Sequence, residues 1–236
     1  MSRTTIIMPG RCQNVMLTNM YRAALASCKA SCDAHVLFMD NTGTPEGYVI
    51  KAFCDTLGYS YYQFDFPSPY CNAKWWNHGV SITESEFICY ANADLIFFPG
   101  WLERLLWHWQ RNNWNYHSMH PYSWSPTENN MNYKSKDAPR NECVSCDHPG
   151  AYAGLFRRSE GYVWDERYFC AEDDCDYWMW LKANQRMAGV CYDARVDHLC
   201  GCVQMFKGDT GDSNLPDGTN AKALSAQRFK EKWGIK

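Results

Sequence analysis

The amino-acid sequence predicts one α/β domain in which a mostly parallel sheet is flanked by helices. Strand-like and helix-like patterns alternate through the first hundred residues, and helices of about 10–15 residues between strands are typical of parallel βαβ units. The chain of 236 residues, 46% of them hydrophobic, is long enough to bury a large core as one domain. No apolar run approaches the roughly 18 residues that a membrane span requires.

The first half of the chain supplies this alternation. Apolar residues at helical spacing predict helices at 14–30, 46–57 and 73–83, and short β-branched or aromatic runs predict strands at 4–8, 35–39, 59–64 and 87–91. Pro9 closes the first strand, and Asp40 and Asp94 follow the second and the fourth. Because ligands of parallel sheets bind beyond the carboxyl ends of the strands, these two aspartates are candidate site residues.

The second half is less regular. We expect a helix at 101–110, strands at 153–157 and 190–196, and a helix at 173–183 that opens with acids, where the helix dipole favours them. The stretch 112–150 is rich in Asn, Pro and Ser and is expected to be irregular. We divide the chain into a single domain at 1–220 and a basic C-terminal helix at 221–236.

The charge is nearly balanced. With 23 basic and 26 acidic residues the net charge is -3, which excludes the global footprint of a nucleic-acid-binding or membrane-binding protein. Two segments depart from this balance. Residues 160–176 hold seven acids against one arginine, and residues 222–236 hold five basic residues against one acid. The first segment predicts acidic side chains that line a pocket, and the second predicts a basic C-terminal tail.

The first residues and the cysteines indicate the cellular compartment in which the protein is expected. The first ten residues contain too short an apolar stretch for a signal peptide. The 13 cysteines, an odd number, show no regular disulfide spacing. We therefore expect a cytoplasmic protein whose cysteines are mostly free thiols.

Four segments, in order along residues 4–200, together resemble the family 2 glycosyltransferases with the GT-A fold. They are 4–9 with 36–40, 76–79, 87–94 with 99–102, and 164–177 with 197–198. The third is similar to the family's DxD strand and the helix start that follows it, and the fourth to its acidic run and late histidine. The resemblance implies a Rossmann-like GT-A fold, with a nucleotide-binding half at about 1–100 and an acceptor and catalytic half at about 101–220.

The resemblance also implies an activity, which is the inverting transfer of a sugar from a nucleotide-diphosphate sugar to a hydroxyl acceptor. Asp94 and His198 would hold a Mn²⁺ or Mg²⁺ ion, and Asp174, with Asp173 beside it, would be the general base. The residues implied to contact the nucleotide sugar are Pro9, Asp40, Asn77, Asn92 and Asp94.

Two positions depart from the family's pattern. Asn92 stands in place of the first DxD acid, which removes one negative charge, and Trp180 replaces an arginine that often follows the acidic helix. The acidic run fits the pattern in two registers, 172–173 or 173–174. We take the second, because Asp176 and Tyr177 then match the family's Asp-Leu pair.

The residue types suit this chemistry. A departing diphosphate needs a divalent cation, and Mg²⁺ and Mn²⁺ take carboxylate oxygens, while Mn²⁺ also accepts imidazole. A carboxylate opposite the leaving group can remove the acceptor's proton, which is typically worth about 10²–10⁴-fold in rate. Acids crowded at 172–176 raise one another's pKa, which helps a base.

Each candidate also has a plainer structural interpretation. Asp40 could form a turn, and Asp94 could cap a helix. Asp173 and Asp174 could be partners of a helix dipole, and His198 could be an ordinary loop histidine. The ordered set of segments, rather than any one residue, favours the enzyme.

A competing set of residues has the chemistry of zinc ligands. Cys143 and Cys146, together with Cys200 and Cys202 after His198, could form a tetrahedral structural Zn²⁺ site. The plainer interpretation is a set of buried free thiols. A zinc site would favour a different class of function, a non-catalytic zinc-stabilised binding module on a GT-A scaffold.

Aromatic residues predict the acceptor side. Sugars and bases both stack on aromatic faces, so Trp124, Trp75 or Trp76 could contact the acceptor. The acceptor itself stays open between a saccharide, a protein, a metabolite and a hydroxylated DNA base. The basic tail favours DNA and the net charge argues against it. No G-x-G-x-x-G follows the first strand, which argues against a dinucleotide-dependent oxidoreductase.

Overall fold

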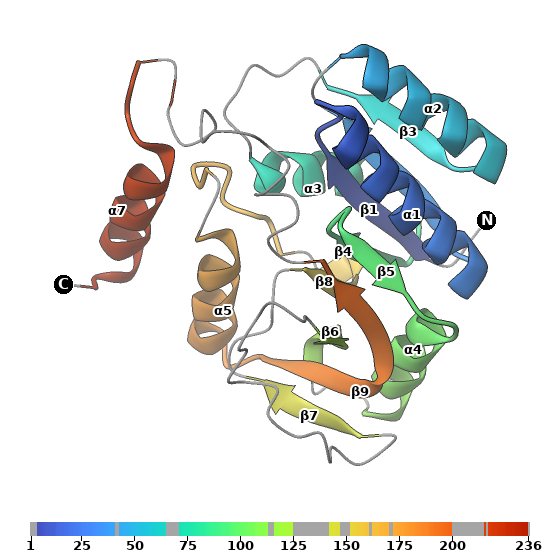
Figure 1. Ribbon diagram of the computed structural model, residues 1–236. Coiled ribbons are helices and arrows are strands. Elements are labelled where there is room, and N and C mark those ends of the chain that lie inside the picture. Colours follow the sequence, from blue (N-terminus) through green and yellow to red (C-terminus); the bar gives the residue numbers. More distant parts are fainter. Residues whose placement is uncertain are drawn as a thin grey trace.

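The computed structural model describes residues 4–40, 43–64, 71–112, 116–124, 142–146, 152–160, 162–169, 172–199, 215 and 217–235. The strands of these segments form one nine-stranded mixed sheet with helices on both faces (Figure 1). Within the described segments, no helix combines the length and the apolar character needed to cross a membrane.

Four parallel strands build the first part of the sheet, in the order β3-β2-β1-β4. They are β1 Thr4–Gly10, β2 His35–Asp40, β3 Ser60–Gln63 and β4 Phe87–Ala91, and the helices between them are α1 Val15–Ser31, α2 Pro45–Leu57 and α3 Asn72–Ser81. These elements confirm the predicted alternation to within a few residues. Gly10 pairs with Asp40, so the segments that follow β1 and β2 start side by side at the carboxyl edge of the sheet.

Local signals explain where these helices begin and end. The Asn14 side chain caps α1 by accepting a hydrogen bond from the Leu17 N–H at 3.0 Å. Thr44 caps α2 in the same way, and Pro45 occupies the first helical position, where its missing N–H costs nothing. Gly58 ends α2 in the left-handed conformation, with φ 72°.

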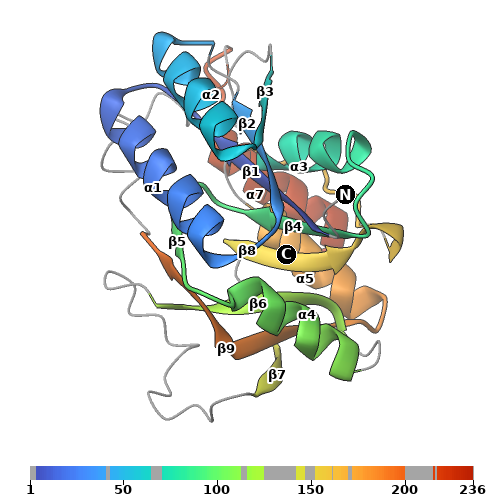
Figure 2. The same ribbon diagram turned by 90° about the vertical axis from the view of Figure 1, so that its right-hand side faces the viewer.

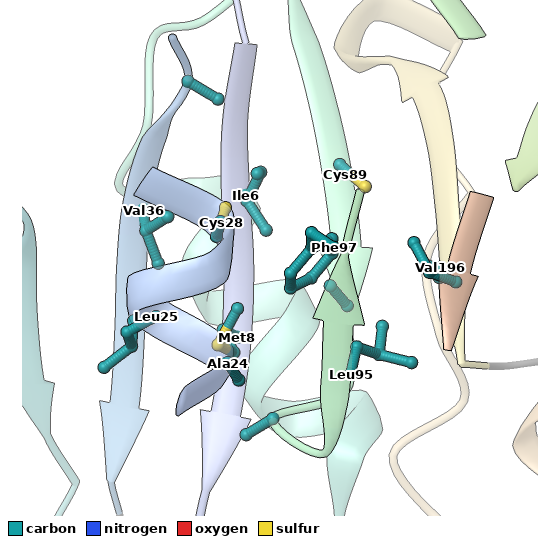
Figure 3. Close-up of a cluster of buried hydrophobic side chains, with 14 of the residues drawn as sticks. Ile6, Met8, Ala24, Leu25, Cys28, Val36, Cys89, Leu95, Phe97 and Val196 are labelled. Atoms are coloured by element: carbon teal, nitrogen blue, oxygen red, sulfur yellow. The ribbon is translucent and has the colours of Figure 1, made fainter. Parts of the chain in front are cut away.

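Alternate residues of the parallel strands face two separate hydrophobic clusters. Ile6, Met8 and Val36 pack against α1 on one face, as Figure 3 shows. Ile7 and Leu37 pack on the other face, in a cluster with α3. In Figure 2, α1 and α2 accordingly lie on one side of the sheet and α3 on the other. Burial on both faces explains why β1, β2 and β4 are continuous apolar runs rather than alternating patterns.

The sheet continues beyond β4 in the order β8-β6-β9-β5, with β7 also paired to β9. The strands are β5 Leu95–Phe97, β6 Tyr116–Trp124, β7 Cys143–Cys146, β8 Ala153–Arg157 and β9 Met187–His198, and the helices are α4 Trp101–Arg111, α5 Asp173–Ala183 and α7 Ala221–Trp233, with a 3-10 turn η2 Arg158–Glu160. β8 runs antiparallel to β4 and β6, and β9 runs parallel to β6. The long strand β9 pairs with β7 near its start and with β5 at its end, both antiparallel.

Three expectations for this half need correction. The stretch 112–150 is not irregular throughout, because β6 and β7 lie within it. Asp94 does not cap a helix, since the strand β5 follows it directly. The last strand is longer than 190–196. In the first two cases pairing with β9, which is distant in sequence, overrides the local composition, and β9 is itself extended by its pairing with β5, β6 and β7.

The acidic segment and the basic tail meet in the fold. Asp176 of α5 is completely buried, and it accepts hydrogen bonds from Lys232 Nζ and Trp233 Nε1 of α7, both at 2.8 Å. The hydroxyls of Tyr162 and Tyr168 donate to the same carboxylate, at 2.7 and 3.2 Å. α7 therefore docks beside α5 (Figure 1) by pairing a buried charge that would otherwise be costly.

Candidate active site

The predicted metal ligands Asp94 and His198 are brought together by the pairing of β5 with β9. Leu95 pairs with His198, and the Leu199 N–H donates to the Asp94 carbonyl oxygen at 2.9 Å. Asp94 Oδ1 then lies 3.3 Å from His198 Nε2. The two side chains are only 9% and 14% exposed. Both side chains therefore lie in a poorly solvated place, where electrostatic interactions are strong.

Tyr152, just before β8, contacts both sides of this pair. Its ring centroid lies 5.4 Å from that of His198, and its hydroxyl donates to the Pro121 carbonyl oxygen at 2.9 Å. Its own carbonyl oxygen accepts from the Asn92 N–H at 2.7 Å. One residue thus supports the turn at 92–94 and the histidine. Sequence reasoning missed Tyr152, because only the antiparallel pairing of β8 with β4 brings it here.

Asp40 lies at the predicted end of β2, and it is completely buried. Its Oδ2 accepts from the Tyr61 hydroxyl at 2.7 Å and its Oδ1 from the Cys12 N–H at 3.4 Å. The first turn of α2 approaches so closely that a Cβ on Gly47 would lie 2.5 Å from Oδ2. The carboxylate therefore fixes the segment after β1 and gains from the positive end of the α2 dipole.

Asp40 and Asp94 act on the same buried tyrosine. Burial raises the pKa of Tyr21, and the charges of Asp94 and Asp40 raise it further. Tyr21 exchanges hydrogen bonds with the backbone of Arg11, which is itself 7% exposed. The Arg11 cation at this edge was not singled out from the sequence, although it stands directly after the Pro9-Gly10 end of the first strand.

Asn77 uses both ends of its amide within the protein. Its Nδ2 donates to the Trp164 carbonyl oxygen at 2.8 Å and to Glu166 Oε1 at 3.0 Å. Its Oδ1 accepts from the Trp164 N–H at 2.9 Å. These bonds tie α3 to the segment 162–169. The sequence predicted instead that Asn77 contacts the nucleotide sugar. In the structure, the polar atoms of its side chain already have protein partners.

The candidate bases Asp173 and Asp174 open α5, after Glu172 in the left-handed conformation with φ 71°. The Asp173 carboxylate accepts from the Asp174 N–H at 3.1 Å, and the Asp174 carboxylate from the Cys175 N–H at 2.8 Å. Burial and the charge of Asp174 raise the pKa of Asp173 to about 7. Asp173 therefore has the pKa of a group that exchanges a proton near neutral pH.

These two acids lie at the end of β4. Burial raises the pKa of Tyr90, in β4, and the charges of Asp174 and Asp173 contribute to this rise. Asn72, at the start of α3, hydrogen-bonds to Asp173 and opposes the rise in its pKa. Since the chain runs from Tyr90 directly to the turn at 92–94, the start of α5 acts electrostatically on the strand that leads to Asp94.

The predicted acceptor contacts Trp75 and Trp76 need correction. Both lie in α3 and are 1% exposed. The ring centroid of Trp76 lies 4.6 Å from that of Trp164 and 5.1 Å from that of Tyr90. These rings fill the core, so neither presents a face to a sugar. The side chain of Trp124, at the end of β6, lies outside the described residues.

The proposed zinc cysteines are placed differently from a C-x-x-C knuckle. Cys143 and Cys146 lie at opposite ends of the strand β7, and three residues of strand span about 10 Å. Two cysteines in a C-x-x-C pattern can bind the same ion only where the chain between them turns, not where it forms an extended strand. Cys143 pairs across the sheet with Cys191 of β9. Cys200 and Cys202 lie outside the described residues.

A cavity of about 480 Å³ opens at the opposite edge of the sheet. Thr5 and His35, at the amino ends of β1 and β2, line it with Lys29, Tyr59 and Ser85. It is therefore separate from the carboxyl edge, where the candidate site residues lie.

The fold matches solved structures, whereas the sequence comparisons found no match. No family model and no curated protein sequence matches the chain. The crystal structure of S. aureus TarS 1–349 superposes with a TM-score of 0.61 at 12% identity, over 97% of this chain and 72% of that one. A crystal structure of S. aureus TarS gives 0.66 at 13% identity, over 98% and 43%. GalNAc-T7 with UDP, GalNAc and Mn²⁺ gives 0.71 at 10% identity, over 97% and 48%.

These neighbours are GT-A-type glycosyltransferases. This chain spans about half the length of two of the matched chains and nearly three quarters of the third. The superpositions cover almost the whole of this chain, so the likeness concerns the complete sheet and its flanking helices. At 10–13% identity it establishes the fold. The chain therefore has the GT-A fold that the four sequence segments implied.

Proposed function

We propose that this chain is a metal-dependent glycosyltransferase that moves a sugar from a nucleotide-diphosphate sugar to a hydroxyl acceptor. The observation that carries the proposal is the Asp94–His198 pair, 3.3 Å apart, beyond the end of a central strand in a GT-A fold. The GalNAc-T7 neighbour was crystallised with UDP, GalNAc and Mn²⁺, which supports the same class of donor and cation here.

Asp94 and His198 fit a hard divalent cation. Neighbouring ligands of an octahedral ion with bonds of about 2.1 Å lie about 3.0 Å apart, close to the 3.3 Å between Oδ1 and Nε2. One carboxylate and one imidazole suit Mn²⁺ better than Mg²⁺, which prefers oxygen. Asn92 adds an amide group in the same turn without a second charge. A bound ion would neutralise the charge of the departing diphosphate.

The transfer needs a group that removes the acceptor's proton. The acceptor oxygen bonds to the anomeric carbon while the bond from that carbon to the phosphate oxygen breaks. The nucleoside diphosphate leaves with the bonding electron pair. The hydroxyl proton passes to a carboxylate on the side opposite the leaving group, and this geometry inverts the anomeric centre.

Asp173 and Asp174 supply that carboxylate in our proposal. The sequence motif favours Asp174 as the base, whereas the pKa of about 7 favours Asp173. The two observations agree if the carboxylates work as a pair. The charge of Asp174 strengthens the proton affinity of Asp173, and Asp173 holds the transferred proton.

The nucleotide side of the proposed site lies at the ends of β1 and β2. Pro9 and Asp40 border it, and Asp40 contributes by holding the Cys12 N–H and the Tyr61 hydroxyl. Asn77 contributes by holding the segment 162–169. These residues position the site through their protein contacts, and their loss would weaken donor binding indirectly.

The contacts of the basic tail bear on the acceptor. Lys232 pairs with Asp165 at 3.1 Å and with Asp176 at 2.8 Å. Arg228 donates to the Arg167 carbonyl oxygen. These two side chains are engaged within the fold, which weakens the argument that the basic tail makes for a hydroxylated DNA base as the acceptor.

Thermal unfolding with nucleotides tests the proposal. We expect one of UDP, GDP, CDP and TDP to raise the Tm only together with Mn²⁺, because a ligand that binds the native state stabilises it by mass action. Asp94→Asn should abolish this shift. The control Asp55→Asn, at an exposed position of α2, should keep it. An equal shift in Asp94→Asn would contradict the metal assignment, and no shift with any nucleotide would favour a non-catalytic binding module.

A further inference from the structure

A second group of metal-ligating side chains lies away from the candidate active site. His108, Cys143 and Cys191 come from α4, β7 and β9, and their ligand atoms all lie within 4.8 Å of one another. The proposed transfer reaction does not use this group. It combines residues that are distant in sequence, so no spacing pattern reveals it.

The sheet and a helix build the cluster. Cys143 and Cys191 are directly opposed in the antiparallel pair of β7 and β9. His108 lies in the last turn of α4. The Met119 thioether, from β6, joins them, with its Sδ 3.6 Å from Cys143 Sγ and 4.0 Å from Cys191 Sγ. His108, Met119 and Cys191 are each at most 2% exposed.

The surroundings hold these donors in place. Asp193 Oδ1 lies 2.7 Å from His108 Nε2, which leaves Nδ1 as the ring nitrogen for a cation. Ligating histidines usually make such a second bond to a carboxylate. The cluster also needs a glycine at 189, since a Cβ there would lie 2.6 Å from Cys143 Sγ and 2.8 Å from Met119 Sδ.

We propose that His108, Cys143, Cys191 and Met119 bind one soft d¹⁰ cation, Zn²⁺ or Cu⁺. Sulfur ligands of a tetrahedral ion with bonds of about 2.3 Å lie about 3.8 Å apart, and the two observed sulfur–sulfur distances are 3.6 and 4.0 Å. Two thiolates, an imidazole and a thioether select soft cations over Mg²⁺ or Mn²⁺. The carboxylate of the candidate active site favours a harder cation than these sulfur ligands do.

The cation has a structural role in this proposal. β7 is a four-residue strand, and within the described part of the chain it pairs with β9 alone. A cation held by β7, β9, β6 and α4 fastens this short strand to the body of the sheet. The proposed site differs from the zinc site that the sequence offered as an alternative, because its ligands come from four elements.

Cys143 and Cys191 could form a disulfide with each other instead of binding a cation. The Tyr192 N–H donates to the Glu142 carbonyl oxygen, next to the Cys143–Cys191 pair. Cys143 and Cys191 therefore occupy a non-hydrogen-bonded position, where side chains approach most closely. A disulfide could form there under oxidising conditions, and the test must distinguish it from a cation.

Elemental analysis of the full chain, purified without added metal or chelator, tests the proposal. We expect about one equivalent of Zn or Cu per chain, and the element found identifies the cation. Cys143→Ser and Cys191→Ser should each lose it. Cys54→Ala, at a buried cysteine of α2, and Asp94→Asn should both keep it, which separates this site from the candidate active site.

The wild-type chain provides a second measurement in case the cysteine variants do not fold. After chelator treatment, Co²⁺ should produce a thiolate-to-cobalt absorption band that saturates near one equivalent. The proposal is overturned by retention of the metal in both serine variants. It is also overturned by a Cys143–Cys191 disulfide in the intact chain, or by a metal-free chain that gives no cobalt band.

Discussion

At the scale of single residues, the raised pKa of Asp173 links the stability of the chain to pH. Its pKa is raised from 3.8 to about 7 by burial and by the charge of Asp174. The folded chain therefore binds a proton that the unfolded chain releases between about pH 4 and pH 7. The contribution of this group to the free energy of unfolding falls as the pH rises through that window.

Asp173→Asn should remove this pH dependence. In urea unfolding of the wild-type chain, we expect the contribution of Asp173 to the free energy of unfolding to fall between about pH 4 and pH 7. The variant should show a flatter dependence of this free energy on pH, because an amide does not titrate. Asp55→Asn, with an exposed carboxylate, serves as the matched control. An identical profile in wild type and Asp173→Asn would contradict the assigned pKa.

Single residues also show what sequence reasoning can and cannot assign. Asp94 and His198 could be chosen because their residue types and order carried the signal, and β5 and β9 do bring them together. The contacts of Asn77 could not be predicted, because its partners in 162–169 are known only once the chain is folded. Trp75 and Trp76 show the same difficulty, since a tryptophan in a core and one in a binding site look alike in a sequence.

At the scale of elements, the parallel half of the sheet could be predicted and the antiparallel half could not. β1, β2 and β4 are continuous apolar runs, and the helices α1 and α2 between the first strands have side-chain caps, so these elements carry their own local signals. β5 has three residues, and β7 has four within a polar stretch. Both depend on pairing with β9, which lies far away in sequence, and a local pattern does not contain this information.

The docking of α7 makes a prediction at this scale. Asp176→Ala should lower the free energy of unfolding by about 3 kcal/mol or more, because it leaves Lys232 and two tyrosine hydroxyls without their buried partner. Urea unfolding would measure the loss. Glu231→Gln, on the exposed side of α7, should change the stability by less than about 0.5 kcal/mol. Equal effects of the two substitutions would show that Asp176 does not anchor the helix.

At the scale of the whole molecule, a net charge of -3 conceals an ordered distribution of charge. The acidic segment and the basic tail neutralise each other where α7 meets α5. The carboxylates left at the sheet edge, Asp94, Asp173 and Asp174, belong to the candidate active site. The sulfur-rich cluster of His108, Cys143 and Cys191 also includes a residue of β9, so one long strand carries residues of both proposed metal sites.

The central claim is that the Asp94–His198 pair holds the cation on which sugar-nucleotide chemistry depends. The most direct measurement is the release of nucleoside diphosphate from UDP-, GDP-, CDP- and TDP-sugars, with water as the acceptor and with or without Mn²⁺. We predict Mn²⁺-dependent release from one donor class, reduced at least about 100-fold in Asp94→Asn and unchanged in Asp55→Asn. Release that needs no metal, or that persists in Asp94→Asn, would contradict the account.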